Sequence, residues 1–187
     1  MHRLFVAIDL PPLVKRELTE ICSSLPGARW VKAEQIHLTL RFIGEVDDGI
    51  FQDIRKELAD IKSSAFTMRL AGLGFFPPRR PPHVLWAGVE PVESIVVLRD
   101  WVEAALVGLG LEPEGRKFSP HVTLARLRDI SVARVEHYLA ANMSFVSSEF
   151  QVSAFHLYSS VLTSNGAIHQ VETSYPLDKS GLLRSPL

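Results

Sequence analysis

Hydrophobic and polar positions along the chain switch between two spacings, one typical of strands and one typical of helices. The apolar run over residues 3–10 predicts a buried strand. Pro11 and Pro12 end this strand, and the fixed φ of proline suits the first turn of a helix that we predict over residues 12–24. Residues 45–64 predict a second helix, in which a capping aspartate precedes apolar residues at helical spacing: Asp47 or Asp48, then Ile50, Ile54, Leu58 and Ile61.

The rest of the chain continues this mixture of strands and helices. One strand pair is predicted at 29–32 and 36–43, and another at 66–76 and 83–90, joined by the proline-rich segment PPRRPPH. The remaining predicted elements are helices over 92–109 and 131–142, a strand at 121–127, and closing strands near 145–156, 157–162 and 167–174. The order β-α-β-β-α-β-β-α-β-α-β-β-β is an α+β pattern, with antiparallel sheets covered on one face by helices.

Two strand segments carry the same pattern, His-apolar-Thr-apolar. The first is HLTL at 37–40, within IHLTLRF, and the second is HVTL at 121–124, within PHVTLAR. Successive side chains of a strand point to opposite faces, so each His shares a face with its Thr while the apolar neighbours face the core. One copy in each half of the chain indicates a duplicated unit, and therefore a bilobal fold with two pseudo-symmetric lobes facing each other.

If the two strands lie side by side, the side chains of His37, Thr39, His121 and Thr123 converge on one cleft. Such a quartet suits phosphoryl chemistry. A neutral imidazole can take a proton from an attacking water while a protonated one gives a proton to the departing oxygen, and an unperturbed pKa of about 6.5 makes both states accessible. The threonine hydroxyls can hydrogen-bond the non-bridging oxygens, so no metal is required. Alternation also puts Arg41 on the face of His37, where substrate and solvent are equal alternatives as its contact.

Composition narrows the class of protein. With 187 residues, the chain can build one sizeable core, so we expect a single two-lobed domain over 1–187 with a loosely held tail over about 178–187. A hydrophobic fraction of 47% with 22% charged residues is typical of a soluble globular protein, and no apolar run is long enough to cross a membrane. No unexplained apolar stripe is left over, so a monomer is expected.

The cysteine content and the net charge each exclude a class of site. Cys22 is the single cysteine, which rules out an internal disulfide and a cysteine-based zinc site and indicates a cytoplasmic protein. The net charge of -1 argues against a broad basic surface that grips long duplexes.

The chain resembles the two-histidine phosphoesterases, and within them the RNA 2′,3′-cyclic phosphodiesterases of bacteria and archaea, long called 2′-5′ RNA ligases. The resemblance rests on the paired His-x-Thr motifs and covers nearly the whole chain, through RLFVAIDLP, WVKAEQIHLTLRFIGEV, HVLWAGVE, RKFSPHVTLAR and LYSSVLTSNGAIHQVETSYPL. It implies a bilobal α+β fold with a central water-filled cleft, and hydrolysis of RNA 2′,3′-cyclic phosphate ends to 2′-phosphates without metal or cofactor. Some members also join RNA ends through a 2′-5′ linkage. The expected partner is RNA with such ends, tRNA fragments included.

Carried onto this sequence, the resemblance implies a role for each residue of the two motifs. His37 matches the family's proton donor to the leaving 3′ oxygen, and His121 matches the residue that activates water. Thr39 and Thr123 match its phosphate-binding hydroxyls. Arg126 falls on an arginine that approaches the phosphate in relatives, but strict alternation from His121 puts it on the opposite face, so a bulge would have to redirect it.

Two histidines stand where the sequence departs from the family pattern. His169 takes the place of a tyrosine and His83 that of an arginine. We expect His169 to fill a strand position and not to act as a third catalyst. Trp86 and Phe42 are candidates for stacking a base, although alternation from the first motif favours a core position for Phe42.

Three other functions are weighed against this one. The substrate of the same chemistry can instead be a small cyclic phosphate of the ADP-ribose 1″,2″-cyclic type. A second alternative is an RNA-end binding module whose histidines recognise the end without reacting. A histidine-rich metal site is disfavoured, because the chain lacks a compact pair such as H-x-x-x-H and two distant histidines with threonines make a poor ligand set.

Overall fold

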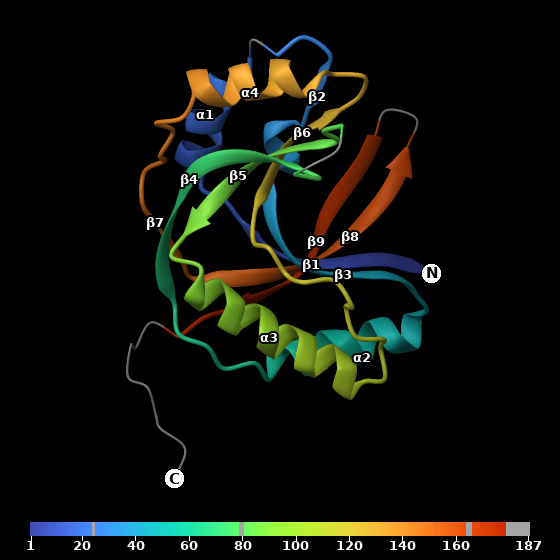
Figure 1. Ribbon diagram of the computed structural model, residues 1–187. Coiled ribbons are helices and arrows are strands. Elements are labelled where there is room, and N and C mark those ends of the chain that lie inside the picture. The colour runs from blue at the N-terminus through green and yellow to red at the C-terminus, as the bar shows by residue number, and fades with distance from the viewer. Residues whose placement is uncertain (24, 79–80, 164–165, 179–187) are drawn as a thin grey trace.

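A computed structural model describes residues 1–23, 25–78, 81–163 and 166–178 of the chain (Figure 1). Its elements follow the predicted order. The strands are β1 (His2–Asp9), β2 (Ala28–Trp30), β3 (His37–Val46), β4 (Phe66–Phe76), β5 (Val84–Glu90), β6 (Val122–Leu127), β7 (Phe150–Val152), β8 (Ala154–Thr163) and β9 (Gly166–Pro176). The helices are α1 (Pro12–Ile21), α2 (Asp48–Ala59), α3 (Glu93–Gly108) and α4 (Val132–Ala141), with a short 3-10 helix at Ala33–Gln35.

The helix boundaries follow from local chemistry. Helix α1 begins with Pro12 in its first turn, as predicted, and ends at Ile21. At the start of α2 the Asp47 carboxylate accepts a hydrogen bond of 2.9 Å from the backbone N–H of Ile50. The side of α2 that faces the core buries three apolar residues, Phe51, Ile54 and Leu58.

The strands of the described residues form one nine-stranded sheet in the order β7-β4-β5-β6-β3-β1-β8-β9, with β2 added on β6. Neighbouring strands are antiparallel, as predicted. The predicted pairing of the strands near 29–32 and 36–43 is wrong, because β2 pairs with β6 and β3 pairs with β1 and β6. The predicted division of the closing strands at 156 is also wrong, because β8 begins at Ala154.

The sheet curls so that the two pairs of helices cover its outer sides (Figure 1). Helices α2 and α3 lie below β1, β3, β8 and β9, and we call this group the β3 lobe. Helices α1 and α4 lie above β4, β5 and β6, and we call these elements, together with β2 and β7, the β6 lobe. The predicted two-lobed α+β fold is confirmed. Neither lobe is one half of the sequence, since α1 lies in the β6 lobe and α3 in the β3 lobe.

Strand β1 is buried on both faces, which explains its continuous apolar run. Leu4, Val6 and Ile8 belong to the main core under the helices. Phe5 and Ala7 point to the other face, where they form a small second cluster with Tyr158 of β8. This second cluster lies under the residues of the candidate site described below.

Helix α3 has an apolar outer side, which was not predicted from the sequence. Val96, Val97, Trp101 and Val107 are 37–55% exposed. The expectation of a monomer rested on the lack of such a stripe, so this reason for it is wrong, and the oligomeric state stays a prediction. Within the described residues, no helix is both long and apolar enough to span a bilayer.

The single domain with a loose tail also stays a prediction. Asp178, where the tail was expected to start, forms a parallel bridge with Ser64. The rest of the expected tail, 179–187, lies outside the described residues.

Candidate active site

The two motif strands lie side by side at the junction of the lobes. Strands β3 and β6 pair antiparallel with Leu38 opposite Val122. Extending this register by one residue each way puts His37 across from Thr123 and Thr39 across from His121. Directly opposite side chains lie about 5 Å apart at Cβ, so the four polar groups form one compact quartet with the histidines on a diagonal.

Burial along both strands separates the polar quartet from the core. Leu38, Val122 and Leu124 are fully buried, and Leu40 is almost fully buried. The four polar residues between them are only partly buried. The predicted alternation is therefore confirmed over 37–40 and 121–124.

Both imidazoles of the quartet are held in the same way. Nδ1 of His37 lies 2.7 Å from the carbonyl oxygen of Gln35, and Nδ1 of His121 lies 2.7 Å from that of Ser119. In each case the carbonyl belongs to the residue two positions earlier. A carbonyl only accepts, so Nδ1 carries the proton and donates it, and Nε2 is left as the atom that can exchange a proton with a substrate.

His37 lies in an aromatic environment. Its ring centroid is 4.9 Å from that of Phe5, 6.1 Å from that of Tyr158 and 5.3 Å from that of His169. Burial lowers the pKa of His37 to about 4, and the nearby His169 acts in the same direction. The Gln35 carbonyl opposes this shift only in part. His37 is therefore neutral at neutral pH when no ligand is bound.

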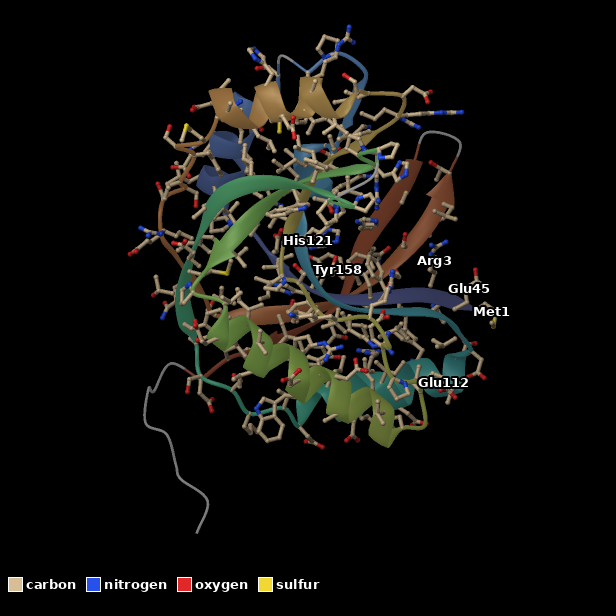
Figure 2. The ribbon with its side chains drawn as sticks, viewed as in Figure 1. Met1, Arg3, Glu45, Glu112, His121 and Tyr158 are labelled. Atoms are coloured by element: carbon tan, nitrogen blue, oxygen red, sulfur yellow. The ribbon has the colours of Figure 1, made fainter. Side chains whose placement is uncertain are left out.

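His121 lies against aromatic residues of the β6 lobe. Its ring is 5.0 Å from that of Phe76 and 6.4 Å from that of Trp86. The indole of Trp86 lies across Gly74 of the neighbouring strand, where an added Cβ would come within 2.2 Å of the ring. Figure 2 places His121 and Tyr158 in the middle of the molecule, between the two pairs of helices.

A bulge in β6 redirects Arg126. Strand β5 pairs Trp86 with Thr123 and Val84 with Arg126, and the register shift between these pairs leaves Leu124 of β6 as the extra residue, unpaired with β5. Val84 and Trp86 are two residues apart and share a face, so Arg126 faces the same side as Thr123. Its side chain is exposed there. The bulge that its predicted role requires is present.

A second bulge, in β3, removes Arg41 from the site. Strand β1 pairs Ala7 with Thr39 and the next residue, Val6, with Arg41, so Leu40 is the extra residue. Arg41 therefore shares the side of Val6, which belongs to the main core, and its side chain pairs with a glutamate of α3. The prediction that Arg41 lies on the face of His37 is therefore wrong, which removes the basis of its assignment to substrate binding.

The same bulge brings in a residue that was assigned to the core. Phe42 is 56% exposed and its ring lies 5.9 Å from that of Phe5, on the side of His37. His169 does occupy a strand, but the pairing of β8 with β1 and β9 brings its ring next to His37. Nδ1 of His169 is buried and has no hydrogen-bond partner among the described residues. The side chain of His83 is exposed just before β5.

The arrangement can carry out proton transfer on an anion. It offers two imidazoles whose Nδ1–H groups are already bonded to carbonyls, two hydroxyls and one exposed guanidinium on one face of paired strands. In the described part of the chain, no three His, Cys, Asp or Glu residues are grouped so that they could hold a metal ion. Imidazole nitrogens beside hydroxyl and guanidinium donors suit proton transfer to and from a bound phosphate.

Comparison with known proteins places the chain among phosphoesterases. The family model described as LigT-like phosphoesterase matches twice, over residues 8–86 and 89–169, and each match contains one His-x-Thr motif. An RNA 2′,3′-cyclic phosphodiesterase of Thermotoga maritima is 34% identical over 183 residues, which cover 90% of this chain and 92% of the relative. The enzyme of the same name from Aeropyrum pernix is 38% identical over 142 residues, 75% of this chain and 81% of the relative.

Solved structures share the fold over almost the full length. A protein of Thermus thermophilus superposes with a TM-score of 0.81 at 26% identity, covering 96% of this chain and 100% of that one. LigT of Escherichia coli in its apo form gives a TM-score of 0.78 at 25% identity, covering 95% and 98%.

Proposed function

Because the chain belongs to the family of LigT-like phosphoesterases, we propose that it is an enzyme that hydrolyses the 2′,3′-cyclic phosphate at RNA ends to a 2′-phosphate. The observation that carries this proposal is the matched setting of two histidines on paired strands. Each imidazole donates Nδ1–H to a backbone carbonyl two residues earlier, which leaves Nε2 as the atom that can exchange a proton and suits a pair that acts on one phosphate.

In the proposed reaction the two histidines take opposite roles. Nε2 of His121 accepts a proton from a water molecule as its oxygen forms a bond to phosphorus. The bond between phosphorus and the 3′ oxygen breaks, and this oxygen takes a proton from Nε2 of His37. The products are a 2′-phosphate and a 3′-hydroxyl, and the proton gained by His121 returns to His37 through solvent before the next turnover.

The remaining polar groups bind the phosphate. The hydroxyls of Thr39 and Thr123 flank the histidine pair and can donate hydrogen bonds to the non-bridging oxygens, where negative charge is concentrated in the transition state. The guanidinium of Arg126 adds a positive charge on the same face as Thr123. These donors need no metal ion or cofactor.

His37 has to gain its proton when substrate binds. Its pKa of about 4 means that the free protein holds a neutral imidazole at pH 7. A phosphate carries a negative charge into the quartet, and an opposite charge at close range raises the pKa of a histidine. We therefore propose that the substrate itself converts His37 into the acid that its hydrolysis requires.

An RNA oligonucleotide ending in a 2′,3′-cyclic phosphate tests the proposal. It is incubated in excess chelator with wild type, His37→Ala or His121→Ala, and the terminal phosphate is identified by digestion and mass spectrometry. We expect a 2′-phosphate from wild type and an unchanged end from both variants. A 3′-phosphate as the product, or turnover at the wild-type rate by both variants, would contradict the proposal.

Two parallel reactions separate the proposed function from its alternatives. A mononucleotide 2′,3′-cyclic phosphate and ADP-ribose 1″,2″-cyclic phosphate are compared with the oligonucleotide at equal concentration, and we expect the oligonucleotide to have the highest kcat/KM. Faster turnover of the ADP-ribose compound would make a small cyclic phosphate the substrate. Substrate recovered intact after prolonged incubation with saturating protein would indicate a binding module.

We also propose that the site can form a 2′-5′ linkage. An RNA 5′-hydroxyl in the place of water can attack the same phosphorus, with His121 and His37 in the same roles. RNA with a cyclic end and RNA with a 5′-hydroxyl, incubated together at high concentration, should then give a joined product that resists enzymes specific for 3′-5′ linkages. Absence of any joined product would contradict this activity without affecting hydrolysis.

A further inference from the structure

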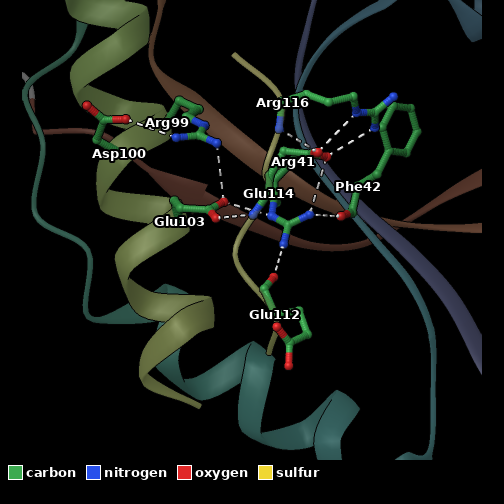
Figure 3. A network of polar contacts seen from close by, with 8 residues as sticks. All are labelled: Arg41, Phe42, Arg99, Asp100, Glu103, Glu112, Glu114 and Arg116. Carbon is green, nitrogen blue, oxygen red and sulfur yellow. Dashed lines mark hydrogen bonds and ion pairs between the residues drawn. The ribbon is translucent and has the colours of Figure 1, made fainter. Parts of the chain in front are cut away.

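Arg41 forms the centre of a polar network on the helix-covered side of β3 (Figure 3). Its Nε lies 2.7 Å from the Glu103 carboxylate on α3, as an ion pair whose N–H direction is not aligned for a hydrogen bond. Its two terminal nitrogens donate hydrogen bonds to the carbonyl oxygens of Phe42, at 2.6 Å, and Glu112, at 2.5 Å. The Arg41 side chain is only 11% exposed and that of Glu103 only 14%.

The same network holds the connection between α3 and β6. Residues 109–121 contain no helix or strand, so their path depends on side-chain contacts. The Glu103 carboxylate accepts a hydrogen bond of 2.7 Å from the backbone N–H of Glu114, and one of the terminal nitrogens of Arg41 lies 3.7 Å from the Glu114 carboxylate. Further along, the guanidinium of Arg99 lies 5.5 Å from the ring centroid of Phe118.

This connection ends at the carbonyl that orients a proposed catalytic residue. Ser119 directly follows Phe118, and its carbonyl oxygen is the acceptor for Nδ1–H of His121. The network therefore lies at one end of a short irregular segment and the His121 imidazole at the other. Arg41 belongs to β3, the strand that also carries His37. Its contacts therefore fix the position of this irregular segment relative to His37.

We propose that Arg41 is a positioning residue for His121: by clamping the 112–118 segment against α3, it holds the Ser119 carbonyl where it keeps the His121 proton on Nδ1. The catalytic consequence rests on the proposed function, whereas the orientation of His121 does not. Because Nε2 must be unprotonated to accept a proton from water, loss of this carbonyl contact puts part of the His121 population in the wrong tautomer.

An arginine suits this position better than a lysine. Its planar fork can reach Glu103, the Glu112 carbonyl and the Phe42 carbonyl at once, while a single ammonium is a compact point charge. Glu103 is also shared with Arg99, whose terminal nitrogen lies 3.5 Å from the same carboxylate oxygen. An Arg41→Lys variant therefore retains a cation beside a buried carboxylate and loses chiefly the fixed contacts to the segment.

The test compares Arg41→Lys with Arg69→Lys. Arg69 forms an exposed ion pair with Glu90 on β4 and β5, so it provides the same substitution at an ion pair outside the network. The first readout is the pair of ¹⁵N chemical shifts of the His121 ring, which reports the tautomer without any substrate. The second is kcat and KM on RNA ending in a 2′,3′-cyclic phosphate.

In Arg41→Lys we expect the Nδ1–H tautomer of His121 to lose population while the ring shifts of His37 stay unchanged. We expect kcat to fall by about 10- to 100-fold, with KM within about threefold of wild type, because the error is in orientation and not in binding. Arg69→Lys should match wild type in both readouts. A folded Arg41→Lys protein with wild-type His121 shifts and kcat would overturn the proposal.

If Arg41→Lys does not fold, the Glu103→Gln variant tests the same proposal with the same two readouts. This variant keeps the shape of the side chain and removes the charge that holds Arg41 and the segment together. Unchanged His121 shifts in folded Glu103→Gln would overturn the proposal. Lack of turnover in wild type would contradict the proposed function alone, because the His121 shifts would still report on the clamp.

Discussion

The His121→Ala variant isolates the protonation of His37, because it should still bind a cyclic phosphate but lacks the group that activates water. A cyclic phosphate diester keeps one negative charge across the range of pH 5 to 8. Proton exchange during its binding therefore reports on the protein alone. With the pKa of free His37 at about 4, almost all of this imidazole is neutral at pH 6.

The expected size of the effect follows from two opposing energies. Protonating a group with a pKa of about 4 at pH 6 costs about 2.7 kcal/mol. A negative charge about 4 Å away, at an effective dielectric constant of about 20, returns about 4 kcal/mol. The attraction exceeds the cost, so the pKa of His37 should rise to about 7 in the complex and binding at pH 6 should take up about 0.9 proton per site.

Isothermal titration calorimetry measures this uptake directly. Titrations of adenosine 2′,3′-cyclic phosphate into His121→Ala are repeated in buffers that differ in ionisation enthalpy, and the slope of the observed enthalpy gives the number of protons. A double variant, His37→Asn with His121→Ala, is the control. The control retains His169 and His156, so uptake that persists in it would show that a group other than His37 is the acceptor.

No proton uptake by His121→Ala would contradict the proposed role of His37 as the acid. It would mean that His37 stays neutral beside the phosphate, as a general base does. The roles of the two histidines would then have to be exchanged, with His121 as the acid.

The other predictions concern stability and the phosphate-binding groups. The lowered pKa of His37 means that the unfolded chain binds this proton more readily, so the free energy of unfolding should fall as the pH drops from about 6.5 towards 4, by at most about 3 kcal/mol. Urea titrations should show this fall in wild type and a smaller one in His37→Asn, and equal falls would contradict the buried, neutral state. Thr39→Val and Thr123→Val should each lower kcat by about 100-fold, less than either histidine replacement, and wild-type rates in steady-state assays would remove the hydroxyls from the mechanism. Arg126→Ala should raise KM and weaken its dependence on salt, and an unchanged salt dependence would place this guanidinium away from the phosphate.

Regular strand alternation made part of the site predictable. The faces of His37 and Thr39 follow from the period of two, because the ladder between β3 and β1 is regular up to Thr39. The same holds in β6 as far as Thr123. A duplicated motif with this spacing therefore predicted which side chains would meet if the two strands were neighbours, before any strand order was known.

Beyond these points the alternation fails, because the register shifts by one residue at Leu40 in β3 and at Leu124 in β6. Leu40 and Leu124 are ordinary apolar residues, and neither carries a local signal such as glycine that would mark a bulge. The bulge at Leu40 turns Arg41 towards α3 and Phe42 towards the site, so both predictions made by parity were wrong. The bulge in β6 has the opposite consequence and brings Arg126 to the predicted side.

Long-range pairing explains the other differences. The contact between His169 and His37 passes through β8 and β1, which are separated by almost the whole chain. Helix α3 lies in the β3 lobe although it belongs to the second half of the sequence. Neither arrangement has a local pattern in the sequence, since both depend on which strands become neighbours.

The assignment of acid and base is tested most directly by changing the leaving atom. Two substrates are compared, an RNA 2′,3′-cyclic phosphate and its analogue with sulfur in place of the bridging 3′ oxygen, with wild type, His37→Ala and His121→Ala. A thiolate leaves without being protonated, because thiols have a pKa of about 8.5, far below that of an alcohol. We predict that sulfur restores His37→Ala to within about tenfold of wild type and leaves His121→Ala inactive, since only the former lacks the acid. Restoration of His121→Ala, or of neither variant, would contradict it.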